Sequence, residues 1–354
     1  AGSIVNAAGT LTFGKLIITG TGVTTAGTFA ITNATATAMD VAAAAAFTAT
    51  AGTISFTGAT SGMTVSTTGT AQVYNITING GDFDLAASST LTIANNLTLS
   101  AATDEFDANP TSTVIFSGTT GVITPQVDYA AGVGISLGDV YITGSPTFVA
   151  GGTGNFIVDI EGDDIRVSSV GNFTPGNGTI NFNNATASST VTIVNAGTLA
   201  FNNLTTGTTA ANVLTTASNL TVAGNMTLSV ADTYWQTAGT LSLSGAASAV
   251  TVAATAVPAT PVGMILNSLT VKSTATGATT VGAFIIDVKG DLTVETSGSL
   301  VMAVTGTTNF TGATTKTITN TGTLTFDDFT VANVASNNVA TATSFTVGKD
   351  ITIG

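Results

Sequence analysis

Leu220-Thr-Val-Ala-Gly-Asn-Met-Thr-Leu228 recurs without a gap as Phe345-Thr-Val-Gly-Lys-Asp-Ile-Thr-Ile353. In both copies threonine alternates with an apolar residue on either side of a short turn that contains glycine. Alternation with period two, in residues that are often β-branched, predicts strands with one buried and one solvent-facing side. The two copies are separated by about three units of about 42 residues each. This separation predicts that they occupy equivalent positions in a structural repeat.

A second phrase, Gly-Thr followed by an apolar residue, any residue and Phe or Leu, marks single strands. Its copies span residues 9–13, 52–56, 178–182, 197–201, 239–243 and 322–326. The spacings approximate multiples of about 20 residues, and imperfect repeats of that length are typical of solenoids, whose rungs bury their apolar sides on one another. We therefore predict an all-β fold, a parallel β-helix or β-solenoid of roughly 17 to 18 rungs with no capping helix.

The prediction for domain organisation is a single continuous β-solenoid over residues 1–354. Irregular loops or joints are expected near 104–129 and 255–263, where prolines interrupt the repeat. A row of β-sandwich domains is the alternative, because sandwiches also have short strands with turn signals about every 8 to 12 residues. Sandwich modules usually carry a buried Trp or Tyr in each copy, whereas this chain has one Trp and four Tyr, which favours the solenoid.

The composition excludes several classes of function. The net charge is −13, from 6 Lys+Arg against 19 Asp+Glu, and the chain has neither His nor Cys. Disulfide scaffolds, Cys/His zinc sites and His-dependent catalytic triads are therefore excluded. Nucleic-acid binding needs clustered Lys and Arg side chains, whereas those of this chain are scattered singly. No nucleic-acid partner is therefore expected. The longest apolar run, Val41–Phe47, is far shorter than the ~20 residues of a spanning helix, so no membrane span is expected.

Acidic residues cluster in three short stretches. The densest holds Asp159, Glu161, Asp163 and Asp164. Alternating carboxylates in a turn can converge on Ca²⁺, which takes about six to eight oxygens. This set is the candidate metal site, with Ca²⁺ the one cofactor considered, and the alternative is a solvated turn whose charge Arg166 partly neutralises. The stretches 82–84 and 104–107 are similar but less dense.

The carboxylates of 159–164 also suggest a second function, glycoside hydrolysis, because that reaction uses a pair of carboxyl groups. Such sites gather bases and aromatic platforms around the acids, and this chain is poor in both. We therefore expect no enzymatic activity and predict no catalytic residue.

Two further patterns involve threonine and asparagine. Asn-x-Ser/Thr sequons are candidate glycosylation sites in a secreted protein. They begin at Asn33, Asn75, Asn96, Asn172, Asn177, Asn184, Asn203, Asn219, Asn225 and Asn309. Thr-x-Thr pairs on a flat solenoid side would suit ice binding only if they recurred in one column, and their intervals in the sequence are irregular.

The strand phrases resemble the repeat regions of bacterial extracellular β-helix proteins, of the adhesin and autotransporter-passenger kind. The resemblance rests on the stretches 219–228, 290–294 and 322–326. It implies a β-helix located outside the cell or at its surface. Apart from a second copy of the chain, surface glycans are the one partner considered. The absence of Cys and the scarcity of Lys also suit a secreted product.

The chemically bland sequence favours a structural subunit of an extracellular filament or surface fibre. The stretch from Ile353 across a junction to Gly9 of a second copy is nearly as long as the stretch from Leu228 to Gly239. This similarity predicts head-to-tail self-assembly through the terminal rungs, with the second copy as the partner. The expected interface residues are Leu11, Phe13, Phe345, Val347, Ile351 and Ile353. A cell-surface adhesin or stalk segment is the alternative, and an ice- or glycan-binding solenoid is less favoured.

Overall fold

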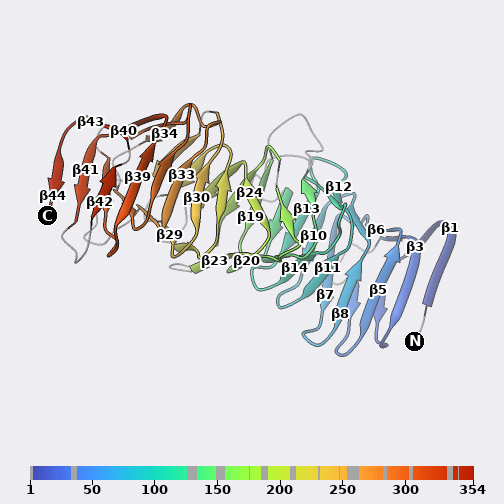
Figure 1. Ribbon diagram of the computed structural model, residues 1–354. Helices are drawn as coiled ribbons and strands as arrows, with labels where there is room; N and C mark the ends of the chain where they lie inside the picture. Colours follow the sequence, from blue (N-terminus) through green and yellow to red (C-terminus); the bar gives the residue numbers. More distant parts are fainter. Residues whose placement is uncertain are drawn as a thin grey trace. The chain divides into compact units, whose positions relative to one another are not determined.

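The fold is described from a computed structural model (Figure 1). The residues that it describes are 3–32, 38–125, 134–148, 156–174, 176–184, 190–207, 213–229, 232–246, 248–252, 263–281, 285–302, 306–332, 338–341 and 343–354. These residues form 44 β-strands and no helix, hence no helix suited to crossing a membrane. The strands pair in parallel, and stacked rungs form a β-solenoid of about 12 turns, which confirms the predicted fold class.

The chain divides into two compact units, and each is described here by itself. Unit 1 comprises residues 1–180 and 196–198, and unit 2 comprises residues 181–195 and 199–354. In each unit a full rung contributes one strand to each of three sides. We name these sides 1A, 1B and 1C in unit 1, and 2A, 2B and 2C in unit 2.

In unit 1 the strands of each side pair in parallel from one rung to the next. Side 1A contains β5 (Ala46–Ala51), β8 (Thr70–Val73), β11 (Thr90–Ile93), β14 (Thr113–Phe116), β17 (Asp139–Ile142) and β20 (Asp164–Val167). Side 1B contains β6 (Thr53–Phe56), β9 (Asn75–Ile78), β12 (Leu97–Leu99), β15 (Val122–Thr124), β18 (Thr147–Phe148) and β21 (Asn172–Phe173). Side 1C contains β2 (Leu16–Ile18), β4 (Met39–Val41), β7 (Thr60–Val65), β10 (Asp82–Leu85), β13 (Glu105–Ala108), β16 (Gly134–Leu137) and β19 (Ile157–Ile160). The long strands β1 (Ser3–Phe13) and β3 (Val23–Ile31) pair with each other, and β3 continues onto both β5 and β6.

Unit 2 repeats this three-sided arrangement. Side 2A contains β23 (Thr190–Asn195), β26 (Val213–Thr216), β29 (Thr233–Gln236), β32 (Gly263–Leu266), β35 (Ile285–Val288), β38 (Thr307–Phe310), β41 (Asp328–Val331) and β44 (Ile351–Ile353). Side 2B contains β24 (Thr198–Phe201), β27 (Leu220–Val222), β30 (Thr240–Leu243), β33 (Ser268–Val271), β36 (Leu292–Val294), β39 (Lys316–Asn320) and β42 (Val339–Thr341). Side 2C contains β25 (Asn203–Thr206), β28 (Met226–Leu228), β31 (Ala249–Val252), β34 (Ala278–Val281), β37 (Ser299–Val301), β40 (Thr323–Phe326) and β43 (Thr346–Val347). Two strands contain residues of both units: β24, whose Thr198 belongs to unit 1, and the remaining strand, β22 (Thr179–Phe182).

The core of each unit consists of apolar columns that run from rung to rung. In a strand, alternate side chains point to opposite faces, so in-register pairing stacks each inward residue on its counterpart. On side 1C, Phe83, Phe106, Ile135 and Val158 are in register and fully buried. The rings of Phe83 and Phe106 stack with their centroids 5.1 Å apart. The alternating Thr and apolar pattern therefore sets both the buried and the exposed side of each strand, as expected.

Most rungs are longer than the sequence repeat indicated. The spacing between paired residues of successive rungs matches the predicted repeat at Ala71 and Leu91. It is longer at Phe83 and Phe106, and longer still at Tyr234 and Met264. The number of rungs is accordingly lower than predicted. The short spacing from Gly178 to Gly197 misled the estimate, because it joins strands on different sides, β22 and β24, and so covers only part of a rung.

The two copies of the nine-residue phrase also occupy different sides of unit 2. Residues 220–228 form β27 on side 2B and β28 on side 2C. The matching residues 345–353 supply β43 on side 2C and β44 on side 2A, which pair with β40 and β41. The prediction that the copies share a place in the repeat is therefore wrong. The phrase encodes two strands and the corner between them, and more than one corner of the rung accepts it.

The predicted interruption near 104–129 is regular where the structure describes it. Residues 105–124 supply β13, β14 and β15, each paired in register with the preceding rung. Residues 126–129, and 255–262 of the second predicted joint, lie outside the described residues.

Corners are built from glycine and asparagine. At Gly52, φ is +80°, and a Cβ there would lie 1.9 Å from the carbonyl oxygen of Gly27, so only glycine fits. At the next corners Asn75 donates to the carbonyl oxygen of Gly52 (2.9 Å) and accepts from the Asn95 amide (2.8 Å). The Asn96 carbonyl Oδ1 then accepts from the backbone N–H of Val122 (2.8 Å). Asparagine thus links successive rungs.

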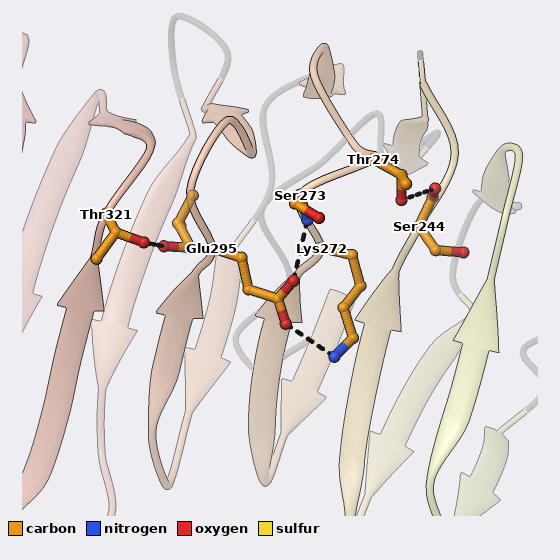
Figure 2. A network of polar contacts seen from close by, with 7 residues as sticks. Ser244, Lys272, Ser273, Thr274, Glu295 and Thr321 are labelled. Carbon is orange, nitrogen blue, oxygen red and sulfur yellow. Dashed lines mark hydrogen bonds and ion pairs between the residues drawn. The ribbon is translucent and has the colours of Figure 1, made fainter.

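A polar network performs the same task at a corner of unit 2, after the strands of side 2B (Figure 2). Glu295 accepts from Lys272 Nζ (2.9 Å) and from the backbone N–H of Ser273 (3.1 Å), one rung earlier. Thr274 donates to the carbonyl oxygen of Ser244 (2.6 Å), a further rung back. The hydrogen bond from Lys272 is the main cause that lowers the pKa of Glu295. The network therefore ties neighbouring rungs together at the solvent-exposed rim.

If the stacked columns supply most of the stability, truncating one of their rings should be costly. Phe106→Ala should lower the free energy of unfolding by about 3–5 kcal/mol, because it removes a fully buried ring and leaves a cavity. Chemical denaturation followed by circular dichroism measures the effect. Thr98→Ala, on the outward side of β12, is the control and should cost less than about 1 kcal/mol. Equal losses in the two variants would contradict the column model.

Candidate functional site

The structure does not bring the four residues of the predicted metal set together. Asp164 begins β20 on side 1A and pairs with Arg166 (2.5 Å). The backbone N–H groups of Asp163 and Asp164 donate to Asp139 Oδ1 (2.9 and 3.1 Å). This half of the set therefore forms a capped, ion-paired corner. In the described part of the chain, no group of three or more acidic side chains is arranged to hold a metal ion.

The other two residues of the set, Asp159 and Glu161, lie on side 1C in a different group of side chains. Asp159 is in register with Ser136, Ser136 with Asp107, and Asp107 with Asp84. Four successive rungs therefore carry Asp84, Asp107, Ser136 and Asp159 in one outward column, to which Glu161 adds a fifth residue just after β19. We call these five residues the carboxylate ladder. It draws one or two residues from each of the three acidic stretches noted in the sequence.

The ladder is shielded from solvent to an unusual degree for outward positions. Ser136 is 0% exposed and Asp159 3%, while Asp84, Asp107 and Glu161 are half-buried. Burial is the main cause that raises the pKa of Asp107, and the Ser136 hydroxyl opposes that shift. Burial also raises the pKa of Glu161, with repulsion from Asp107 and Asp159 adding to the shift. For Asp84, burial and then repulsion from Asp107 and Asp82 raise the pKa.

Bases are scarce around this charge. Residues 1–180 contain twelve acidic residues and two bases, Lys15 and Arg166. Arg166 pairs with Asp164 and lies 5.2 Å from the centre of the Tyr141 ring on side 1A. Residues 181–354 contain seven acidic residues and four bases, and there Lys272 and Lys349 form ion pairs with carboxylates. The unbalanced negative charge is thus concentrated in unit 1.

The acidic stretch at 104–107 is divided between two roles. The Asp104 carboxylate accepts from the backbone N–H groups of Gly80 (3.0 Å), Ser100 (3.0 Å) and Ala101 (2.7 Å) and is buried, so it caps a corner. Only Asp107 belongs to the ladder. Sequence spacing missed the ladder because the step from Asp84 to Asp107 is shorter than the step from Asp107 to Ser136, so the ladder follows no single period.

At one end of unit 2 the apolar columns are uncovered. Ile351 is in register with buried Phe329, and Ile353 with Val331, so both occupy inward positions. Nevertheless they are 60% and 76% exposed, because β44 pairs with β41 on one edge only among the described strands.

Two other predicted interface residues lie just behind this end. Phe345 and Val347 are half-buried, and the Phe345 ring lies 5.2 Å from that of Phe326 and 5.3 Å from that of Phe329. Phe345 and Val347 therefore form part of the last layer of the core and are less exposed than Ile351 and Ile353.

One end of unit 1 is open in the same way. Leu11 and Phe13 on β1 are in register with Phe29 and Ile31, both buried, and so take inward positions. Leu11 is 40% exposed, while Phe13 is half-buried with its ring 6.0 Å from that of Phe29. Leu11, Ile351 and Ile353 are thus exposed apolar side chains at inward positions of β1 and β44.

Side 2B presents a column of hydroxyls that the sequence analysis missed. Successive rungs carry outward Ser or Thr in register across β27, β30, β33, β36 and β39. The five residues are Thr221, Ser242, Thr270, Thr293 and Thr319. The intervals between them are unequal, which hid the column from a search for one period.

The candidate glycosylation residues have diverse settings. Asn172, Asn177, Asn219 and Asn225 are exposed. Asn184 is buried. The half-buried ones are Asn75, Asn96, Asn203 and Asn309, and Asn33 lies outside the described residues. Several side chains are engaged at corners, such as Asn219, which accepts from the backbone N–H of Thr240 (2.9 Å).

Comparison of the chain with protein-family models, curated proteins and solved structures found no match. The resemblance to adhesin and autotransporter-passenger repeats therefore stays a prediction.

The ladder should make stability depend on pH. Asp84, Asp107 and Glu161 have a raised pKa in the folded state, so between the unfolded and folded values the folded protein binds more protons than the unfolded chain. The free energy of unfolding should therefore fall as pH rises through that window and be highest on its acid side. Asp107→Asn combined with Glu161→Gln should reduce this fall and stabilise the protein at pH 7, as measured by thermal melts across pH. A pH profile parallel to that of the native chain would contradict the prediction.

Proposed function

We propose that the chain is a structural subunit of an extracellular filament or surface fibre, which assembles head to tail through the open ends of its solenoid. The observation that carries the proposal is the exposure of inward apolar side chains at both ends, Leu11 on β1 and Ile351 and Ile353 on β44. An unpaired strand edge beside uncovered apolar columns is a ready template for another parallel strand.

The two ends are different surfaces, which favours an open chain of subunits. A contact between unlike surfaces is heterologous, and it produces a filament unless the rotation between copies closes a ring. The contact would continue the pairing already present between β41 and β44 and between β1 and β3. Because the nine-residue phrase occupies different sides of the rung, its register does not determine which strands meet at the junction.

The rest of the described surface suits a structural role. The outward positions are mostly Thr, Ser and Asn, and the corners are tied by hydrogen bonds. An adhesin or stalk segment remains the alternative function, and binding of the purified chain to surface glycans would favour it.

The proposal is tested by blocking one end at a time. The first variant, Ile351→Asp with Ile353→Asp, places charge on β44; the second, Leu11→Asp with Phe13→Asp, places it on β1. We expect the native chain to form concentration-dependent oligomers, visible by light scattering and negative-stain microscopy. Each variant alone should remain monomeric, and an equimolar mixture should stop at dimers, because one competent end remains on each partner.

Thr352→Asp is the matched control, because it adds one charge to the same strand at an outward position in register with Thr330. It should impair assembly much less than the variant that carries Ile351→Asp with Ile353→Asp. Circular dichroism establishes that each variant is folded. A native chain that stays monomeric at high concentration, or end-blocked variants that assemble normally, would contradict the proposal.

The hydroxyl column on side 2B favours a second candidate, ice binding. Strands of neighbouring rungs are about 4.8 Å apart, so Thr221, Ser242, Thr270, Thr293 and Thr319 form a regular row. If the row binds ice, the chain should show thermal hysteresis that Thr270→Lys abolishes and Thr330→Lys on side 2A preserves. Absence of hysteresis in the native chain would remove this candidate.

A further inference from the structure

We propose that the carboxylate ladder of unit 1 binds a divalent cation, with Ca²⁺ as the ion best suited, between Asp107, Glu161 and the Ser136 hydroxyl. This site differs from the set predicted from the sequence, because it uses side 1C alone and excludes Asp163 and Asp164. The inference is independent of the proposed assembly function.

The first argument is geometric. In-register pairing of β13, β16 and β19 puts Asp107, Ser136 and Asp159 on adjacent strands about 4.8 Å apart. Glu161 follows Asp159 closely in the chain and is near enough to Asp107 for the two carboxylates to repel each other. The acidic side chains therefore come from separate parts of the sequence but share one side of the unit.

The second argument is the buried hydroxyl between them. Ser136 is 0% exposed, and its Oγ has no hydrogen-bond partner of acceptable geometry. It nevertheless lies near enough to Asp107 and Glu161 to oppose the rise in their pKa. A hydroxyl whose proton faces carboxylates keeps its oxygen lone pairs free, and a cation would use them.

The third argument is charge. Partly buried carboxylates that repel one another are stable only if they are protonated or paired with a cation. Neither base of unit 1 joins the ladder, since Arg166 is engaged on side 1A and Lys15 precedes β2. No base lowers the pKa of Asp107 or of Glu161, whereas in unit 2 the hydrogen bond from Lys272 lowers the pKa of Glu295.

The choice of ion follows from the ligands. Carboxylate and hydroxyl oxygens suit hard cations, and Ca²⁺ accepts flexible geometry, whereas Mg²⁺ requires a near-ideal octahedron. Because the described acidic side chains do not already converge, binding must draw Asp107 and Glu161 toward Ser136, with water completing the shell. Such a site should be weak, in the range of about 0.1–1 mM typical of extracellular Ca²⁺ modules.

The test is a titration of the full chain with CaCl₂ at pH 7, followed by isothermal calorimetry and by the melting temperature. Matched titrations use MgCl₂ and NaCl of equal ionic strength. We expect saturable binding of Ca²⁺ and a rise in melting temperature that exceeds the rise in either salt. Asp107→Asn should weaken binding roughly tenfold or more, and Ser136→Ala should weaken it severalfold.

Asp287→Asn in unit 2 is the charge-matched control. Asp287 is partnered by the Asn309 amide (3.0 Å) and lies outside the ladder, so its loss should leave Ca²⁺ binding unchanged. Asp107→Asn combined with Glu161→Gln should stabilise the Ca²⁺-free protein and remove the effect of Ca²⁺, which also shows that the variant is folded. Equal effects of Ca²⁺ and NaCl, or equal losses in D107N and D287N, would overturn the proposal.

Discussion

Parallel strands stacked in register impose one rule on each unit, that every side chain lies beside its counterpart in the next rung. Where the stacked residues are apolar, as at Phe83 and Phe106, the rule builds a dense core without any helix among the described residues. Where they are carboxylates, as at Asp84 and Asp107, it brings like charges together. The apolar column and the repelling carboxylates of side 1C are therefore consequences of the same backbone pairing.

Strand identity was predictable from the sequence because it is a local property. Alternation such as Leu91-Thr92-Ile93 states which side chains are buried without reference to any other part of the chain. Rung length was less predictable, since corners absorb different numbers of residues and the spacing varies from Ala71–Leu91 to Tyr234–Met264. The same nine-residue phrase also forms strands on different sides of the rung. Matching phrases therefore do not show which side of the rung a strand occupies.

The candidate sites depend on which side of the rung each residue occupies. For that reason the sequence identified the acidic residues of the ladder but neither their grouping nor the hydroxyls that join them. Asp159 and Asp164 are close in the sequence and lie on different sides, whereas Asp84 and Asp159 are far apart and share one column. The hydroxyl column on side 2B was hidden in the same way. Exposed apolar ends were easier to anticipate, because the inward positions of β1 and β44 follow from alternation alone.

The corner network of Figure 2 has a mechanical consequence. Within a unit, a force along the strands is shared by all the hydrogen bonds of a pair at once, whereas a force across them opens one rung at a time. Glu295 bonds to Lys272 and Ser273 of the preceding rung, and Thr274 bonds to Ser244 of the rung before that, so these three rungs are joined at their rim as well as along their strands. Peeling such a stack should proceed in steps of one rung, each resisted by its own fastening, so that local damage is contained and the rungs behind it stay intact.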